Sequence, residues 1–155
     1  MATTIVPSNL IVTITESYTL NGVAYGNTMN KTYTDNGHVS QRVMSIASKD
    51  AEGTTWTDIL ALTTVDGQGQ VVKTDYKYFR ITNLDTVNTL YLRTYNGIDY
   101  VAFEVSPASS LLLMDAGYDA TLTTTIVTLS DISKISGQSS STTEAIDVEF
   151  VMVTV

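Results

Sequence analysis

The chain has 155 residues, which suits one domain with one hydrophobic core. Its formal net charge of −8 argues against binding to nucleic acid or to an anionic membrane surface, because both attract proteins largely through Lys and Arg. Cysteine is absent, so disulfides and thiolate metal sites are excluded, and no apolar stretch reaches the about 18 residues of a membrane-spanning helix.

The composition favours strands over nearly the whole chain. Only 15% of the residues are charged, whereas Ser, Thr and β-branched residues are abundant. Such residues suit the pleated surface of a sheet and are mediocre helix formers. The first residues lack the basic and apolar regions of a signal peptide, so we expect synthesis in a cytoplasm. Residues 1–9 are expected to form an extended arm.

The N-terminal part predicts a long hairpin. Apolar residues at even positions alternate with polar ones over residues 10–20, the pattern of a strand with one buried face. Asn21-Gly22 is the preferred pair for a type I′ turn, because both central residues need a positive φ. We expect residues 23–33 to return as a polar edge strand and the Asp-Asn-Gly sequence at 35–37 to form the next turn.

Strands and turns continue to alternate in the middle of the chain. A third strand is expected over residues 38–47, with Val43, Met44 and Ile46 as core candidates. Residues 56–63 also match helical spacing, but their short length and their threonines favour a strand. Further strands are expected over residues 71–83, 90–95, 98–105 and 111–114, with turns at 83–85 and at Asn96-Gly97.

The C-terminal part predicts two or three more strands. Residues 121–129 alternate, Ile132 and Ile135 extend that pattern, and residues 137–143 read as a flexible Ser-rich loop. Residues 145–155 predict a strong terminal strand. About ten short strands with turn signals between them are typical of a sandwich. We therefore expect an all-β fold, a single β-sandwich or jelly-roll-like domain of antiparallel strands over residues 1–155.

The residue types that carry catalysis or bind metals are sparse. His38 is the only histidine, and it has neither a cysteine nor a second histidine to form a triad or a transition-metal site. Asp147 and Glu149 would share a face of the last strand, about 7 Å apart, which suits a glycosidase; a solvated outer face is the simpler interpretation. We expect no enzyme activity, no metal and no cofactor.

The aromatic and β-branched residues instead suggest contacts with other proteins. Tyrosine is favoured at interfaces because it combines apolar area with a hydroxyl group. A run of exposed valines on the last strand would need a cover, either the rest of the domain or another chain. The expected partner contacts are Tyr25, Tyr33, Tyr91, Tyr95, Tyr100, Val151, Val153 and Val155. The same tyrosines could also pair across strands within the sheet or line a carbohydrate-binding face.

One segment resembles a protein family. The sequence Tyr-Phe-Arg-Ile-Thr-Asn-Leu-Asp at 78–85 is followed by Asn-Thr-Leu-Tyr-Leu at 88–92, the Asn96-Gly97 turn and Phe-Glu-Val-Ser-Pro at 103–107. This arrangement looks like small virion proteins of tailed bacteriophages, in which an Ile-x-Asn-x-Asp turn joins two strands and a Pro-Gly step leads into an apolar strand. The chain departs from the pattern at Ala108, where glycine is expected.

The resemblance implies a structural subunit of the virion, assembled in the host cytoplasm. The first expectation is a capsid decoration (cement) protein that stabilises the head by contacts with the major capsid protein and forms a homo-oligomer such as a trimer. A tail or head–tail component, such as a tube, adaptor or baseplate protein, is the alternative. A carbohydrate-binding β-sandwich is a further alternative from a different functional class.

Overall fold

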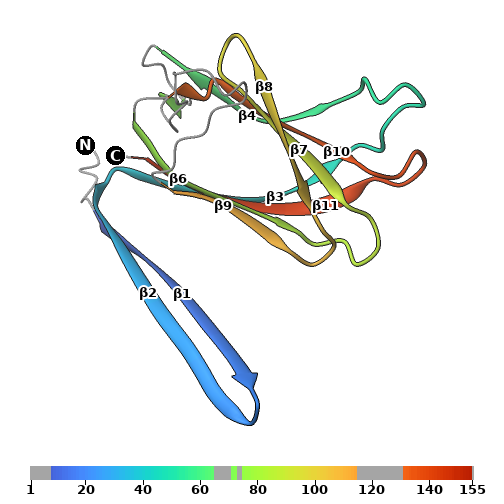
Figure 1. Cartoon of the computed structure of the whole chain (residues 1–155). Coiled ribbons are helices and arrows are strands. Elements are labelled where there is room, and N and C mark those ends of the chain that lie inside the picture. Colours follow the sequence, from blue (N-terminus) through green and yellow to red (C-terminus); the bar gives the residue numbers. More distant parts are fainter. Residues whose placement is uncertain (1–7, 65–70, 73–74, 115–130, 155) are drawn as a thin grey trace. The chain divides into compact units, whose positions relative to one another are not determined.

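The protein is all-β. A computed structural model describes residues 8–64, 71–72, 75–114 and 131–154 (Figure 1). Within these ranges eleven strands form three sheets, and there is almost no helix. The all-β prediction is confirmed, but a single jelly-roll domain over residues 1–155 is not. The chain instead divides into two compact units, a hairpin unit that ends at Gly37 and a sandwich unit over residues 38–154.

The hairpin unit consists of β1 (Ser8–Leu20) and β2 (Val23–Asn36), which pair antiparallel as a two-stranded sheet. Asn21 and Gly22 form the turn with φ values of 51° and 80°. Both angles are positive, as a type I′ turn requires, so this turn prediction is confirmed. The expected arm is only partly described: Ser8 and Asn9 belong to β1, and residues 1–7 lie outside the described ranges.

The turn expected at residues 35–37 does not create a second hairpin. β2 continues to Asn36, and after Gly37 the chain enters β3 (His38–Ile46), which belongs to a different sheet. β3 pairs with β11 (Ile146–Thr154) over nine residue pairs. Only Gly37 separates the two strands, and the terminal strand, rather than the preceding strand in the chain, is the partner of β3.

Two sheets make up the sandwich unit. One has the order β5-β4-β10-β7-β8 and the other β3-β11-β6-β9; all described pairs are antiparallel except β4 with β5. The strands not yet introduced are β4 (Thr57–Thr63), β5 (Val71–Val72), β6 (Tyr76–Asn83), β7 (Leu90–Tyr95), β8 (Tyr100–Val105), β9 (Ser110–Met114) and β10 (Lys134–Ser139). Residues 56–63 are thus a strand, as predicted, and the strand expected over 121–129 lies outside the described residues.

The hydrophobic core lies between these two sheets. Its buried side chains include Ile46, Ile59, Leu62, Phe79, Ile81, Leu90, Leu92, Ile135, Ile146, Val148, Phe150 and Met152. The alternation predicted for the terminal strand is confirmed from Ile146 to Met152, because the even positions in that range all contribute to this core. Val43, predicted in the core, is 63% exposed. That prediction was wrong because Met44 and Ile46 face inward, so Val43 points to the other side of the sheet.

β10 corrects the first three residues of the loop predicted over residues 137–143, whereas residues 140–143 lie outside any strand. Gly137, Gln138 and Ser139 are buried and complete a central strand of the five-stranded sheet. A Cβ atom on Gly137 would lie 2.9 Å from Cδ1 of Ile59 and 3.1 Å from Cδ1 of Leu90, so the missing side chain makes room for core residues. The amide of Gln138 donates 2.6 Å to the carbonyl oxygen of Thr55, which satisfies a polar side chain in a buried strand.

Candidate interaction surfaces

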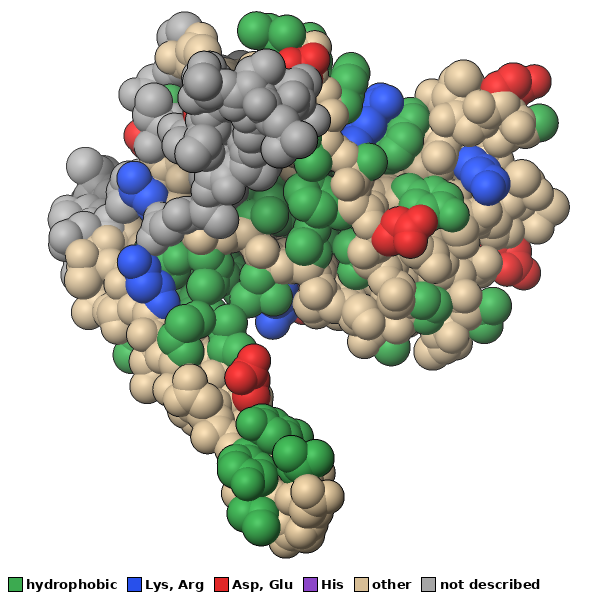
Figure 2. Space-filling view, viewed as in Figure 1, with side chains coloured by type: hydrophobic (Ala, Val, Ile, Leu, Met, Phe, Trp, Pro, Cys, Tyr) green, Lys and Arg blue, Asp and Glu red, His purple; other side chains and the backbone are tan. Residues whose placement is uncertain are grey.

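One face of the hairpin unit is apolar and the other polar. The register places Leu20 opposite Val23 and Tyr18 opposite Tyr25, and directly opposed residues share a face of the sheet. The exposed hydrophobic side chains of this face are Tyr18 (58%), Leu20 (57%), Val23 (53%), Tyr25 (47%) and Met29 (48%). Figure 2 shows hydrophobic side chains gathered near the turn of the hairpin. We call this surface the apolar hairpin face.

The opposite face of the hairpin carries mostly uncharged polar side chains, although Ile11 on it is 64% exposed. The Thr13 hydroxyl donates 2.9 Å to the side-chain oxygen of Asn30, and the hydroxyls of Thr15 and Thr28 lie 3.4 Å apart. These cross-strand bonds satisfy the polar groups within the sheet. The hairpin is therefore amphipathic, although it has only two strands.

The apolar hairpin face carries two charges of opposite sign, Glu16 and Lys31. Glu16 and Lys31 are the only Asp, Glu, Lys or Arg residues from Ser8 to Thr34. A hollow of about 220 Å³ lies on this face, lined by Ile14, Glu16, Asn27 and Met29. Exposed apolar area with few charges is characteristic of protein interfaces, and an isolated two-stranded hairpin is only marginally stable in water. Both properties make this face the candidate contact surface of the hairpin unit.

The tyrosines predicted as partner contacts lie in different environments. Tyr25 and Tyr100 are exposed, Tyr91 and Tyr95 are half-buried, and Tyr33 is only 6% exposed. Tyr25 stacks on its cross-strand partner Tyr18 with ring centres 5.4 Å apart. Tyr95 and Tyr100 form a second cross-strand stack at 4.5 Å. Three of the five predicted contacts thus take part in pairing within a sheet.

The valines predicted on the outer face of the last strand are less accessible than expected. Val151 is half-buried, Val153 is fully buried, and Val155 lies outside the described residues. The side chain of Val153 is therefore not accessible to another chain. Whether these valines contact a partner stays a prediction.

A cation–aromatic stack that the sequence analysis missed extends the second tyrosine pair. The guanidinium carbon of Arg93 lies 4.1 Å from the ring centre of Trp56 and 4.5 Å from that of Tyr100. Such contacts are electrostatically favourable. The alternation in β7 indicated that Arg93 faces outward, but no local signal places Trp56, from the loop before β4, beside it.

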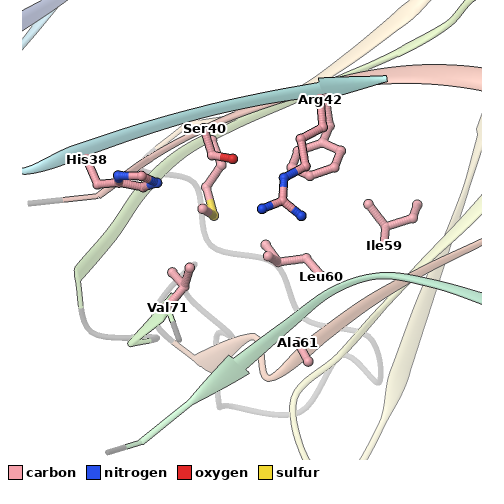
Figure 3. Close-up of a pocket in the computed structure, with 9 residues that line it drawn as sticks. His38, Ser40, Arg42, Ile59, Leu60, Ala61 and Val71 are labelled. Atoms are coloured by element: carbon pink, nitrogen blue, oxygen red, sulfur yellow. The ribbon is translucent and has the colours of Figure 1, made fainter. Parts of the chain in front are cut away.

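A cavity of about 450 Å³ opens between the two sheets of the sandwich unit. It is lined by His38, Ser40 and Arg42 from β3, Ile59, Leu60 and Ala61 from β4, Val71 from β5, and Phe150 and Met152 from β11. Figure 3 shows the side chains of His38, Ser40 and Arg42 extending from β3 toward β4 and β5. This lining contains no carboxylate among the described residues, so no acid–base pair converges there.

The carboxylates considered for glycosidase chemistry lie on the outer face of the four-stranded sheet. Asp147 is exposed, and Glu149 accepts a hydrogen bond from the Arg80 guanidinium at 2.8 Å and another from the Gln41 amide. Glu149 is thus engaged in an ion pair. In the part of the chain that the structure describes, no three His, Cys, Asp or Glu residues gather as a metal site would require.

The Asn-Leu-Asp turn at residues 83–85, which is part of the segment that resembles virion proteins, is held by side-chain hydrogen bonds. Nδ2 of the buried Asn83 donates to the carbonyl oxygens of Asn88 at 2.8 Å and Val105 at 3.1 Å. A carboxylate oxygen of Asp85 accepts from the backbone N–H groups of Asn88 and Val87. These bonds hold the pKa of Asp85 below its ordinary value, and the bond from the backbone N–H of Asn88 has the largest effect.

Ala108, where the resemblance led us to expect glycine, has a φ of 54°. This is the left-handed region that glycine adopts without steric cost. The backbone at this step therefore has the conformation for which glycine was expected, although the side chain is that of alanine.

Comparison of the chain with protein families, with curated proteins and with solved structures found no match. In the described ranges, no helix is long and apolar enough to cross a membrane.

Proposed function

We propose that this protein is a non-enzymatic structural protein of a tailed-phage virion, acting as a capsid decoration protein that stabilises the head through protein contacts. The observation that carries the proposal is the apolar hairpin face. The resemblance of residues 78–107 to small virion proteins supports the assignment to a particle. The formal charge of −8 would favour a basic surface on the partner.

The physical argument starts from the cost of leaving the hairpin unpartnered. Tyr18, Leu20 and Val23 each expose more than half of their surface, and burial of apolar area contributes about 25 cal/mol per Å². A partner that covers this face would gain that free energy and would hold together a sheet that is marginal by itself. Many copies on a lattice would add their contacts.

A carbohydrate-binding role is less well supported by the same residues. Sugar rings stack on open aromatic faces, whereas Tyr95 and Tyr100 stack on each other and Arg93 lies over Trp56 and Tyr100. The proposal predicts no binding on a glycan array, with or without calcium. Specific glycan binding that is lost in Trp56→Ala would contradict it.

Analysis of purified particles tests the proposed location. Quantitative mass spectrometry of virions from the phage that encodes this chain should find the protein at a fixed ratio to the major capsid protein. Antibody labelling should then decorate heads. Labelling of tails, or rings of the protein at the tail, would replace the decoration role by the tail alternative, and absence from virions would end the proposal.

A further inference from the structure

The two charges of the apolar hairpin face are placed symmetrically about its middle. Ile14 and Met29 are directly opposed across the two strands. Glu16 lies two residues from Ile14 toward the turn, and Lys31 lies two residues from Met29 away from the turn. Each charge is therefore about 7 Å from the Ile14–Met29 pair along the hairpin, in opposite directions.

We propose that the apolar hairpin face binds the same face of a second copy of this chain, with the two hairpins antiparallel and centred on Ile14 and Met29. In this arrangement Glu16 of each copy lies across from Lys31 of the other, which forms two ion pairs. The inference rests on the proposed function in treating the apolar hairpin face as a contact surface, and it assigns that face to a second copy of the chain rather than to the major capsid protein.

The charges also select the antiparallel arrangement. If the hairpins packed parallel and in register, the two Glu16 carboxylates would face each other, as would the two Lys31 ammonium groups. Like charges brought together at an interface are destabilising, whereas opposite charges fix the register. A twofold axis at Ile14–Met29 brings each charge opposite its counter-charge, as an isologous interface requires.

The hollow on this face lies at the same place. Its lining consists of Ile14 and Met29 at the proposed centre and Glu16 and Asn27 next to them. A volume of about 220 Å³ accommodates a side chain from a facing copy. Methionine is unbranched and adapts to irregular gaps, so Met29 of one copy is suited to enter the hollow of the other.

The area predicts a weak dimer in solution. Strands of 13 residues span about 40 Å, so two copies of a two-stranded face bury at most on the order of 800 Å² in total, and less because Tyr33 on this face is already covered; this is below the about 1,600 Å² of a standard interface. We therefore expect a concentration-dependent monomer–dimer equilibrium of the purified protein, strengthened where copies are held side by side on a particle.

Charge reversal in the full chain tests the proposal by sedimentation velocity over a concentration series. Glu16→Lys and Lys31→Glu each place like charges across the interface, and each should weaken dimerisation by about tenfold or more. The double variant Glu16→Lys/Lys31→Glu restores opposite charges and should return the dissociation constant to within about threefold of the wild-type value. Thr15→Lys, on the polar face of the same strand, is the matched control and should leave it unchanged.

Three results would overturn the proposal: a monomer at every concentration, single reversals without effect, or a double variant as weak as the singles. Circular dichroism of each variant shows whether the sheets are retained. A chain that is monomeric yet present in virions at a fixed ratio would overturn this inference and leave the proposed function standing. A chain that dimerises as proposed but is absent from virions would overturn the proposed function and leave this inference standing.

Discussion

The side-chain amide of Asn83, at the end of β6, donates a hydrogen bond of 3.1 Å to the carbonyl oxygen of Val105, at the end of β8, and so joins the two sheets of the sandwich unit. The same amide donates 2.8 Å to the carbonyl oxygen of Asn88. Asn83 is fully buried, so its replacement by a side chain without these donors leaves buried carbonyl groups unsatisfied.

We therefore expect Asn83→Ala to lower the free energy of unfolding by about 3 kcal/mol. Urea unfolding followed by the fluorescence of Trp56, the single tryptophan, measures the change. Asn30→Ala is the control, because Asn30 is exposed on the hairpin and should cost no more than about 0.5 kcal/mol. Equal effects of the two substitutions would mean that Asn83 does not join the sheets.

Replacing Ala108 with glycine should stabilise the protein. Its φ of 54° is unfavourable for alanine and neutral for glycine, so Ala108→Gly should raise the free energy of unfolding by about 0.5–1 kcal/mol. The flanking Ser109 does not have a positive φ, so Ser109→Gly should have no stabilising effect. Thermal unfolding of both variants provides the comparison, and a lower midpoint for Ala108→Gly would contradict the assignment of strain.

Gly137 should tolerate no side chain. A Cβ atom there would meet Cδ1 of Ile59 at 2.9 Å and Cδ1 of Leu90 at 3.1 Å, which forces core side chains to move. We expect Gly137→Ala to cost about 1–3 kcal/mol and Gly137→Val to cost more, as is typical of overpacked cores. Gly53→Ala is not a suitable control because its φ is positive, so Ala102→Val, at an exposed position of β8, serves instead. Urea midpoints that rank valine above alanine at residue 137 would count against this packing.

The free energy of unfolding should decrease at acid pH because the carboxylate of Asp85, which holds its turn, becomes protonated. Hydrogen bonds from the backbone N–H groups of Asn88 and Val87 lower the folded-state pKa of Asp85. Because the folded value lies below the unfolded one, this contribution is complete above about pH 4 and is lost as the pH falls through the folded value. Side-chain hydrogen bonds from Thr54 and Thr55 lower the pKa of Asp50, which acts in the same direction.

Urea midpoints between neutral pH and about pH 3 measure this loss. Asp85→Asn keeps an acceptor oxygen for the two N–H groups but does not titrate, so the variant should lose less stability over the acid range than the wild type. An equally steep decline in both proteins would show that the turn does not carry the pH dependence.

Several elements were predictable because their signals are local. The Asn21-Gly22 pair fixes its turn through the positive φ of two adjacent residues. Ile146, Val148 and Phe150 of the terminal strand all face the same core. The alternation of apolar and polar residues in the sequence therefore predicts which side of this strand is buried. Neither signal depends on residues distant in the sequence.

The β10 strand was not predictable from local pattern. Its Gly137, Gln138 and Ser139 have the composition of a loop, and their burial depends on partners elsewhere, such as the Thr55 carbonyl oxygen that accepts from Gln138. The stack of Arg93 on Trp56 likewise joins residues from separate elements. Alternation in β1 predicted an apolar face, but only the structure shows that residues such as Tyr18 and Leu20 remain exposed.

The most direct test of the hairpin as the contact surface is the virion content of matched variants. Phages that carry Tyr18→Ser/Leu20→Ser are compared with phages that carry Thr15→Ser/Thr19→Ser, which changes the polar face of the same strand. We predict that quantitative mass spectrometry finds the first variant reduced at least about tenfold in purified particles and the second at the wild-type ratio. Equal incorporation of both variants, with the apolar-face variant still folded, would contradict the account.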